Sequence, residues 1–367
     1  MFRQLSSLAR KEPIFFALLA AYVLLLIYNI HFLDAGLVEW DTVAIIASFI
    51  IINTGLLVSG GIDLIAGMVL SKVGSTRNLY VFSVIVTVLL SMFITNDASL
   101  IVLVPLTASI GRISGRNLGG IIVLQAISAN VGSMLTPFGN PQNIIMFRHF
   151  ALTPLGFIYA MAPAFAVSLA VLLVFTLAMS KGSGKVAGSG PRSYGKALFY
   201  SSLALFVVDV GFFLAGLGAA VFVAISLVSI LLMLAFRPRS LSKAYTITRI
   251  DFFLILSFVL IFLVINSAST ILPKLHPSNG IGMFLYALLI SQFISNVPAT
   301  VLLEKSSLFL PLSWGVNIGG NGTLIASLAN FIAYRQGKGV GILRFMRLSL
   351  AYMAVVAAIA MVLLFVL

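Results

Sequence analysis

Residues 91–147 decide the fold, and they contain SMFITNDASLIVLVPLT (91–107) and QAISANVGSMLTPFGNPQNIIMF (125–147). In the first stretch, Thr95-Asn96-Asp97 lies between two apolar arms of about 16 and 14 residues, each shorter than the roughly 20 that a spanning helix needs. This pattern predicts a re-entrant helical hairpin over residues 79–110. Its polar tip is expected near the bilayer midplane.

The second stretch predicts a broken transmembrane helix over residues 118–150. Its interruption, TPFGNPQN at 136–143, contains two prolines and a glycine. Proline lacks an amide hydrogen and clashes with the previous helical turn, and glycine adds backbone freedom. Irregular backbone at membrane depth is tolerated only where it lines a protein-enclosed cavity. The hairpin tip and the helix break are therefore expected to face one cavity.

Both features recur in the second half of the chain. SMFITN at 91–96 matches SQFISN at 291–296, and five residues of the broken helix recur 187 positions later: Asn130, Gly132, Thr136, Asn143 and Ile145 match Asn317, Gly319, Thr323, Asn330 and Ile332. The match predicts a second hairpin over residues 281–311 and a second broken helix over 313–334. Paired interruptions in two halves of a membrane chain indicate a transporter site at a repeat interface.

The composition is that of a polytopic membrane protein. Of 367 residues, 61% are hydrophobic and only 8% are charged, whereas soluble domains carry about 25% charged residues. The net charge of +13 does not indicate a nucleic-acid partner, because the basic residues fall at predicted membrane boundaries. The chain has no cysteine and its three histidines show no metal-ligand spacing. Without a nucleophile–base pair, a metal-ligand set or an ATP-binding loop, we expect neither an enzyme nor a cofactor other than a coupling Na⁺ or H⁺.

The apolar segments predict an all-α protein with nine crossings and two hairpins. The expected crossings are residues 13–33, 41–60, 118–150, 154–179, 197–215, 218–236, 251–271, 313–334 and 342–367. With a cytoplasmic N-terminus, every Lys and Arg except Arg148, Lys274 and Lys305 lies inside, as the positive-inside rule requires. The C-terminus is then outside, and the two repeats have inverted orientations.

Three regions follow from this topology. Residues 1–180 form the first repeat, with an N-terminal anchor that carries no cleavage site. Residues 181–196 form a Gly-rich cytoplasmic linker. Residues 197–367 contain an additional helix and the second repeat.

At these motifs the sequence resembles the ion transporter superfamily, and within it the ArsB/NhaD-like branch of arsenite efflux permeases and Na⁺/H⁺ antiporters. The resemblance is carried by ITNDASLIVLVPL (94–106), SANVGSMLTPFGNPQNI (128–144), ISNVPATVLL (294–303) and GVNIGGNGTLIASLANFI (315–332). It implies scaffold and transport domains, elevator-type alternating access, a homodimer and a prokaryotic-type inner or plasma membrane. The related dicarboxylate symporters carry Ser-Asn-Thr at both tips. Here the tips read Thr95-Asn96-Asp97 and Ser295-Asn296-Val297, which disfavours a dicarboxylate or citrate symporter.

The polar residues of the tips and breaks are the candidate site. Their amides and hydroxyls can coordinate a cation or donate to an anion, and the breaks free backbone amides that suit an anion. The alternative is that they only tie the broken backbone together. The candidates are Thr95, Asn96, Asp97, Asn130, Thr136, Gly139, Asn140, Asn143, Ser295, Asn296, Asn317, Gly319, Asn321, Thr323 and Asn330. Na⁺ is expected at Asn96, Asn130, Asn296 and Asn317.

Acidic residues at membrane depth mark an ion or proton path. Burial disfavours the charged form of Asp97 and a bound cation favours it, so this carboxyl can exchange a proton for a cation; alternatively it caps the second hairpin arm. Asp209, within FVVDVGF (206–212), serves either a proton relay or a structural pairing. Glu304 and Lys305 are expected to form a local ion pair.

The leading hypothesis is a secondary transporter that couples H⁺ or Na⁺ to a small inorganic anion or a neutral metalloid acid such as arsenite. An Na⁺/H⁺ antiporter is the alternative, since the same Thr-Asn-Asp tip would serve it. A channel is less favoured because two opposed hairpins suit alternating access better than a continuous pore. The expected partners are the ion substrate and the lipid bilayer.

The predicted topology can be tested by cysteine labelling, because the chain has no cysteine of its own. A cysteine introduced at Ser183 should react with a membrane-impermeant maleimide only after the cells are opened. Labelling of this residue in intact, sealed cells would contradict the inverted-repeat topology.

Overall fold

The fold is entirely helical in the part of the chain that is described. The computed structural model describes residues 12–62, 64, 75–180, 194–237, 242–271, 277–337 and 340–366, in which every regular element is a helix. Seven of these helices are long and apolar enough to cross a membrane. The all-α polytopic class is therefore confirmed. Residues 181–193 of the expected linker lie outside the described residues.

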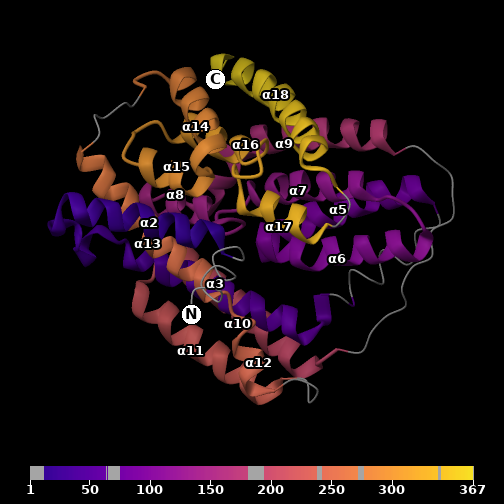
Figure 1. Ribbon diagram of the computed structural model, residues 1–367, viewed down its shortest axis with the longest axis horizontal. Helices are drawn as coiled ribbons and strands as arrows, with labels where there is room; N and C mark the ends of the chain where they lie inside the picture. The colour runs from indigo at the N-terminus through magenta and orange to yellow at the C-terminus, as the bar shows by residue number, and fades with distance from the viewer. Residues whose placement is uncertain are drawn as a thin grey trace.

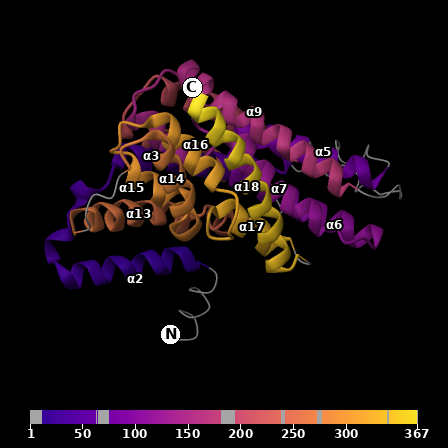
Figure 2. The same cartoon turned by 90° about the horizontal axis from the view of Figure 1, so that it is seen from above.

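The helices form two groups that each pack mainly among themselves (Figure 1). The first group, called the α3 group, contains α2 (Pro13–Tyr28), α3 (Trp40–Ser59), α10 (Lys196–Leu214), α11 (Ala219–Phe236), α12 (Lys243–Ile247) and α13 (Phe252–Ile271). Helices α10 and α11 pack on α3, and α2 lies along α13 at one edge of the molecule (Figure 2). There Phe15 meets Phe253 edge to face with ring centroids 5.1 Å apart.

The second group, called the hairpin group, contains both hairpins and both broken helices. Its members are α5 (Thr76–Ile94), α6 (Asn96–Ser114), α7 (Gly119–Ser133), α8 (Pro141–His149), α9 (Pro154–Met179), α14 (Gly280–Ile294), α15 (Asn296–Leu303), α16 (Phe309–Gly319), α17 (Leu328–Gln336) and α18 (Ile342–Val366). Each hairpin packs on the first half of its own broken helix: α5 on α7 and α14 on α16. The group therefore combines segments of both sequence repeats.

The two hairpins turn with the same backbone conformation. Thr95 has φ 76° and ψ 153°, and Ser295 has φ 75° and ψ 154°. A positive φ is costly for a residue other than glycine, and it persists only where the surroundings enforce it. Here the amide that follows each turn is held by a helix break: Asn96 N donates to Gly139 O (3.1 Å) and Asn296 N donates to Ala326 O (3.0 Å).

A second pair of matching bonds joins each hairpin to its break. Thr136 Oγ1 donates to Met92 O at 2.8 Å. Thr323 Oγ1 donates to Gln292 O at 2.9 Å. The two sequence repeats thus also share equivalent hydrogen bonds.

Two asparagines hold the open backbone of the breaks. Asn143 Nδ2 lies 3.1 Å from Ser133 O, 3.1 Å from Met134 O and 2.9 Å from Thr136 O. Its repeat counterpart Asn330 lies 2.9 Å from both Gly320 O and Thr323 O. The last carbonyls of a helix have no intrahelical donor, and these amides supply one at membrane depth.

The two breaks are also bonded to each other across the repeat. Asn317 Nδ2 donates to Asn143 Oδ1 at 2.9 Å, and Asn130 Nδ2 donates to Asn330 Oδ1 at 3.2 Å. The four side chains are at most 3% exposed. Each bond is the repeat image of the other, so the broken helices are cross-braced at the centre of the hairpin group.

Four predicted boundaries of the hairpins and the second broken helix differ from the structure by several residues. The arms of the first hairpin, α5 and α6, have 19 residues each, because Ser75 caps α5 by accepting from Asn78 N and α6 continues to Ser114. The second arm of the other hairpin, α15, has only 8 residues. Helix α16 then begins at Phe309, before the expected start at residue 313.

The first predicted crossing, residues 13–33, is not one helix. Helix α2 has 16 residues, fewer than the roughly 20 of a spanning helix. It ends because Asn29 adopts an extended conformation and its side chain accepts from His31 N at 3.0 Å. A 3₁₀ turn, η1 (Ile30–Phe32), follows.

The cross-braced breaks predict a large loss of stability when their asparagines are removed. Asn143→Ala and Asn330→Ala each leave buried carbonyls without donors. Each unsatisfied group should lower the free energy of unfolding by about 1–3 kcal/mol. Melting of the detergent-solubilised protein measures the effect. The control is Asn279→Ala, which removes an exposed cap of α14 worth about 1 kcal/mol. If the first two variants melt no lower than the control, the network does not hold the breaks.

Candidate functional site

A cavity of about 450 Å³ lies between the α3 group and the hairpin group. Residues of α3, α6, α8, α13 and α17 line it, together with the α12–α13 connection. Its walls are mostly apolar. The polar and charged side chains among the lining residues are Asn53, Thr54, Thr95, Asp97, Thr248, Arg249, Asp251 and Gln336.

The tip of the first hairpin projects into this cavity. Asn53 on α3 donates from Nδ2 to Thr95 Oγ1 at 3.4 Å, which links the two helix groups. Asn53 Oδ1 and Asp97 Oδ1 are both buried and receive no hydrogen bond from the described residues. Oxygen atoms without donors are suited to a bound cation or to a proton on the carboxyl.

Asp97 does not cap helix α6 in the structure. The Asn96 side chain accepts from Asp97 N at 2.9 Å, and Asn96 N is bonded to Gly139 O. Among the described residues, no amide of the first turn of α6 donates to the Asp97 carboxyl. That carboxyl is therefore available to a ligand in the cavity.

The N-termini of two helices meet the cavity. Helix α6 begins at Asn96, next to Asp97, and α8 begins at Pro141, which with Ile144 lines the wall. Asn140 caps α8, since its Oδ1 accepts from Asn143 N at 2.9 Å. Helix N-termini carry partial positive charge and suit an oxygen-rich ligand. The site therefore places a carboxyl and two positive helix ends around one space.

The remaining predicted residues lie behind the cavity wall. Asn140 Nδ2 donates to Asn317 Oδ1 at 3.1 Å, and Ser327 Oγ donates to Asn130 Oδ1 at 3.1 Å. Gly139 and Gly319 allow close backbone approach: a Cβ would come within 2.3 Å of Ser133 O and 3.0 Å of Leu288, respectively. Asn321, Thr136, Thr323, Asn143 and Asn330 belong to the same bonded network.

The second hairpin tip is placed differently from the first. Ser295 and Asn296 are not among the residues that line the described cavity. Asn296 is 3% exposed, and its Oδ1 lies 3.5 Å from Ser295 Oγ. The expected single cavity thus contains the first tip alone in this conformation.

Asp209 lies within the α3 group, away from the cavity lining. It is fully buried on α10 and its Oδ2 accepts from Ser48 Oγ of α3 at 2.9 Å. Its other carboxyl oxygen receives no hydrogen bond from the described residues. This geometry ties α10 to α3.

Sequence reasoning missed Asn53, Thr54 and the rim residues Arg249 and Asp251. Asn53 could have been found, because it is the one residue with an amide side chain in the span 40–59, and polar residues at membrane depth mark functional sites. The rim residues gave no such signal. Asp251 Oδ1 accepts from Leu254 N and caps α13, and Arg249 lies 5.7 Å from the centre of the Tyr245 ring.

Comparisons with known proteins agree with this architecture. The family CitMHS, described as "Citrate transporter", matches residues 7–305. An inner membrane protein of Escherichia coli, YbiR, is 31% identical over 82% of this chain and 81% of its own length. The uncharacterized transporter MJ0456 of Methanocaldococcus jannaschii is 32% identical over 89% of this chain and 90% of its own length.

A solved structure shares the fold. The crystal structure of the Alcanivorax borkumensis YdaH transporter superposes with a TM-score of 0.52 at 14% sequence identity, and covers 91% of this chain and 89% of that one. At this identity the likeness concerns the fold alone. The family match and the two relatives that cover most of the chain identify it more closely: this protein belongs to the CitMHS citrate transporter family, within the ion transporter superfamily.

Proposed function

We propose that the protein couples H⁺ or Na⁺ to the transport of a small inorganic anion or a neutral metalloid acid, with arsenite as the first substrate to test. The observation that carries this proposal is the position of Asp97. Its carboxyl has an oxygen without a donor among the described residues, and it lies in a cavity where two helix N-termini begin.

The coupling cation binds to Asp97, Asn53 and Thr95. Thr95 and Asp97 lie at the start of α6, next to Asn53 on α3, and the Oδ1 atoms of Asn53 and Asp97 receive no hydrogen bond from the described residues. Asn130 and Asn317 are less suited, because their Oδ1 atoms already accept from Ser327 and Asn140. Asp209 is the next candidate for proton binding.

Electrostatics explains how cation binding would favour the substrate. An ionised Asp97 repels an anion, whereas a proton or Na⁺ on this carboxyl leaves the field of the helix N-termini unopposed. The cation therefore binds first and the substrate follows. Because the carboxyl and the helix ends share one cavity, no long-range conformational relay is required for this step.

The charge of the lining favours a small substrate over citrate. Among the described lining residues, Asp97 and Asp251 are acidic and only Arg249 is basic. A tricarboxylate would need more positive charge than this. Proteins that match shorter parts of the chain support a neutral or singly charged acid: the "Putative transporter arsB" of Dictyostelium discoideum (26% identity over 30% of this chain) and the "Silicon efflux transporter LSI3" of Oryza sativa (31% over 26%).

An Na⁺/H⁺ antiporter is the second candidate. The oxygens of Asp97, Asn53 and Thr95 would serve cation exchange without any further substrate. Flux measurements with and without arsenite separate the two functions.

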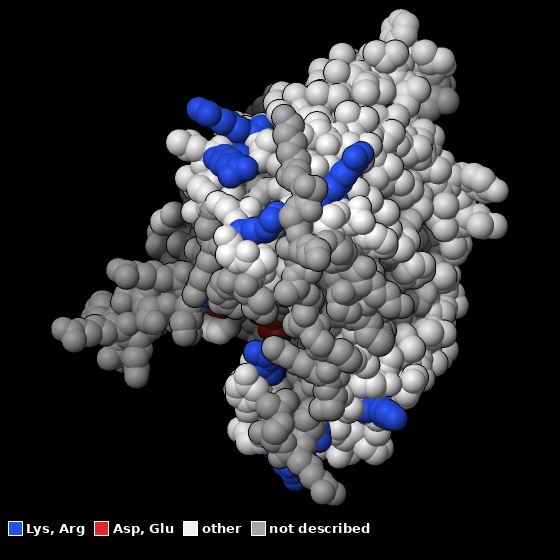
Figure 3. Space-filling model, turned by 90° about the vertical axis from the view of Figure 1, so that its right-hand side faces the viewer, with Lys and Arg blue, Asp and Glu red and all other residues white. Residues whose placement is uncertain are grey.

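Alternating access would follow from movement of the hairpin group along the α3 group. The cavity lies at their boundary, and this arrangement agrees with the elevator mechanism that the family resemblance implies. One end of the molecule carries far more Lys and Arg than Asp and Glu on its visible surface (Figure 3). By the positive-inside rule this end would face the cytoplasm.

Asp97→Asn separates coupling from substrate binding. The variant keeps the side-chain shape and removes the charge, so it should fold, and preloaded proteoliposomes should still exchange arsenite. Accumulation of arsenite driven by a proton or sodium gradient should fall to the equilibrium level.

The matched control is Asp251→Asn at the cavity rim, where asparagine can still cap α13; it should keep gradient-driven accumulation. Gradient-driven accumulation by Asp97→Asn would contradict the assignment of the coupling site. If the unmodified protein exchanges Na⁺ for H⁺ and moves no arsenite, the antiporter is the correct function.

A further inference from the structure

Three metal-ligating side chains from distant parts of the sequence meet at one end of the molecule, away from the cavity. Glu39 precedes α3, His149 ends α8 and Glu304 follows α15. One carboxylate oxygen of each glutamate and one imidazole nitrogen all lie within 4.8 Å of one another. His149 is exposed to solvent and Glu39 is at least partly exposed.

Glu304 provides an independent indication of a bound cation. It is only 2% exposed, and its Oε2 is buried without a hydrogen-bond donor among the described residues. The expected ion pair with Lys305 was wrong: the ion pair found in the described part of the chain joins Arg148 to Asp41. A buried carboxylate without a paired charge is costly, and a metal ion in the cluster would remove that cost.

We propose that Glu39, His149 and Glu304 form a binding site for a divalent transition-metal ion, with Zn²⁺ as the probe. One imidazole and two carboxylates form a ligand set suited to Zn²⁺, whereas Mg²⁺ and Ca²⁺ prefer oxygen ligands alone. Three protein ligands leave one tetrahedral position for water.

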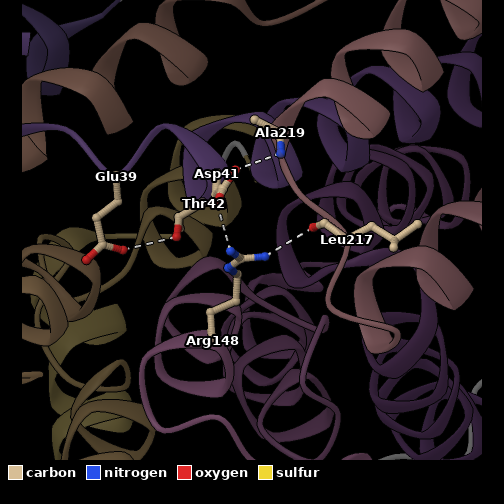
Figure 4. Close-up of polar contacts among 6 residues, drawn as sticks. All are labelled: Glu39, Asp41, Thr42, Arg148, Leu217 and Ala219. Atoms are coloured by element: carbon tan, nitrogen blue, oxygen red, sulfur yellow. Dashed lines mark hydrogen bonds and ion pairs between the residues drawn. The ribbon is translucent and has the colours of Figure 1, made fainter. Parts of the chain in front are cut away.

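The geometry allows the ligands to close on an ion. Metal–ligand distances of about 2.0–2.2 Å require the three atoms to approach one another more closely than 4.8 Å. The side chains of His149 and Glu39, which are at least partly exposed, can rotate to do so. Glu39 Oε2 accepts from Thr42 Oγ1 at 3.1 Å, which orients this carboxylate and leaves its other oxygen for the metal (Figure 4).

The positive charge nearest along the chain to His149 is already neutralised. Arg148 Nη2 donates to Asp41 Oδ2 at 3.0 Å and Arg148 Nη1 donates to Leu217 O at 3.3 Å. Asp41 Oδ1 also accepts from Ala219 N at 2.6 Å, as Figure 4 shows. The arginine is thus directed to Asp41 and the start of α11, and the adjacent imidazole remains free to bind the metal.

A metal ion at this site would join the two helix groups. Glu39 belongs to the chain that enters α3, and His149 and Glu304 belong to the hairpin group. If transport requires these groups to slide, as the proposed function assumes, bound Zn²⁺ would hold this conformation and slow transport. The inhibitory role rests on the proposed function, and the binding site does not.

Metal binding is tested by the melting temperature of the full chain in detergent, with and without Zn²⁺. A ligand that binds only the folded state raises this temperature, so the unmodified protein should melt a few degrees higher with Zn²⁺ and not with Mg²⁺. His149→Ala and Glu39→Gln, both at positions that are at least partly exposed, should lose this rise. His31→Ala is the matched control, since His31 is also exposed and should keep it. The proposed metal site is wrong if Zn²⁺ raises the melting temperature of His149→Ala as much as that of the unmodified protein, or if it does not raise that of the unmodified protein.

Inhibition is tested by substrate exchange in proteoliposomes. Zn²⁺ should slow exchange by the unmodified protein and by His31→Ala, and leave His149→Ala unaffected. If Zn²⁺ raises the melting temperature but does not slow exchange, the inhibitory role is wrong and the metal-binding site stands. If the protein moves no arsenite, the melting experiment still decides the metal site on its own.

Discussion

The structure depends on satisfying the backbone carbonyls that two broken helices expose at membrane depth. Asn143 and Asn330 supply the donors, and each is in turn bonded to an asparagine of the other repeat. Without these amides the breaks could not remain open, because the lipid interior offers no water to replace them. The hairpin tips depend on the same breaks, since Asn96 N and Asn296 N are bonded to carbonyls within them.

The network is symmetric, but the charge of the tips is not. Asp97 follows the first tip and Val297 occupies the matching position of the second. The bonds that hold the backbone are duplicated, whereas the titratable group occurs once. The cavity is found at the charged tip. One carboxyl within a duplicated backbone framework agrees with the proposed coupling at Asp97.

Local polar signals predicted the tips and breaks well, because Thr95, Asn96 and Pro141 are conspicuous in apolar surroundings. Helix ends were predicted less well, since they depend on single caps such as Ser75 and Asn29. Two residues predicted as ligands are bonded to other residues of the breaks: Asn130 to Ser327 and Asn330, and Asn317 to Asn140 and Asn143. Their roles depend on partners about 190 residues away, which no local pattern reveals. The cluster of Glu39, His149 and Glu304 could not be predicted for the same reason.

Helix α8 reaches both the cavity and the α3 group. Its first residue, Pro141, lines the cavity, and Arg148 near its last turn bonds to Asp41 in the α3 group. The side chains of this ion pair are 24% and 48% exposed, and pairs of this kind contribute up to about 1 kcal/mol. Such a bond can break and reform in every cycle. By contrast, the buried contact of Asp209 with Ser48 lies inside the α3 group, where elevator movement would leave it intact. The boundary thus combines this exposed ion pair with buried aromatic contacts, such as Phe147 of α8 against Phe213 of α10 with ring centroids 5.0 Å apart, which the proposed movement would have to exchange for others.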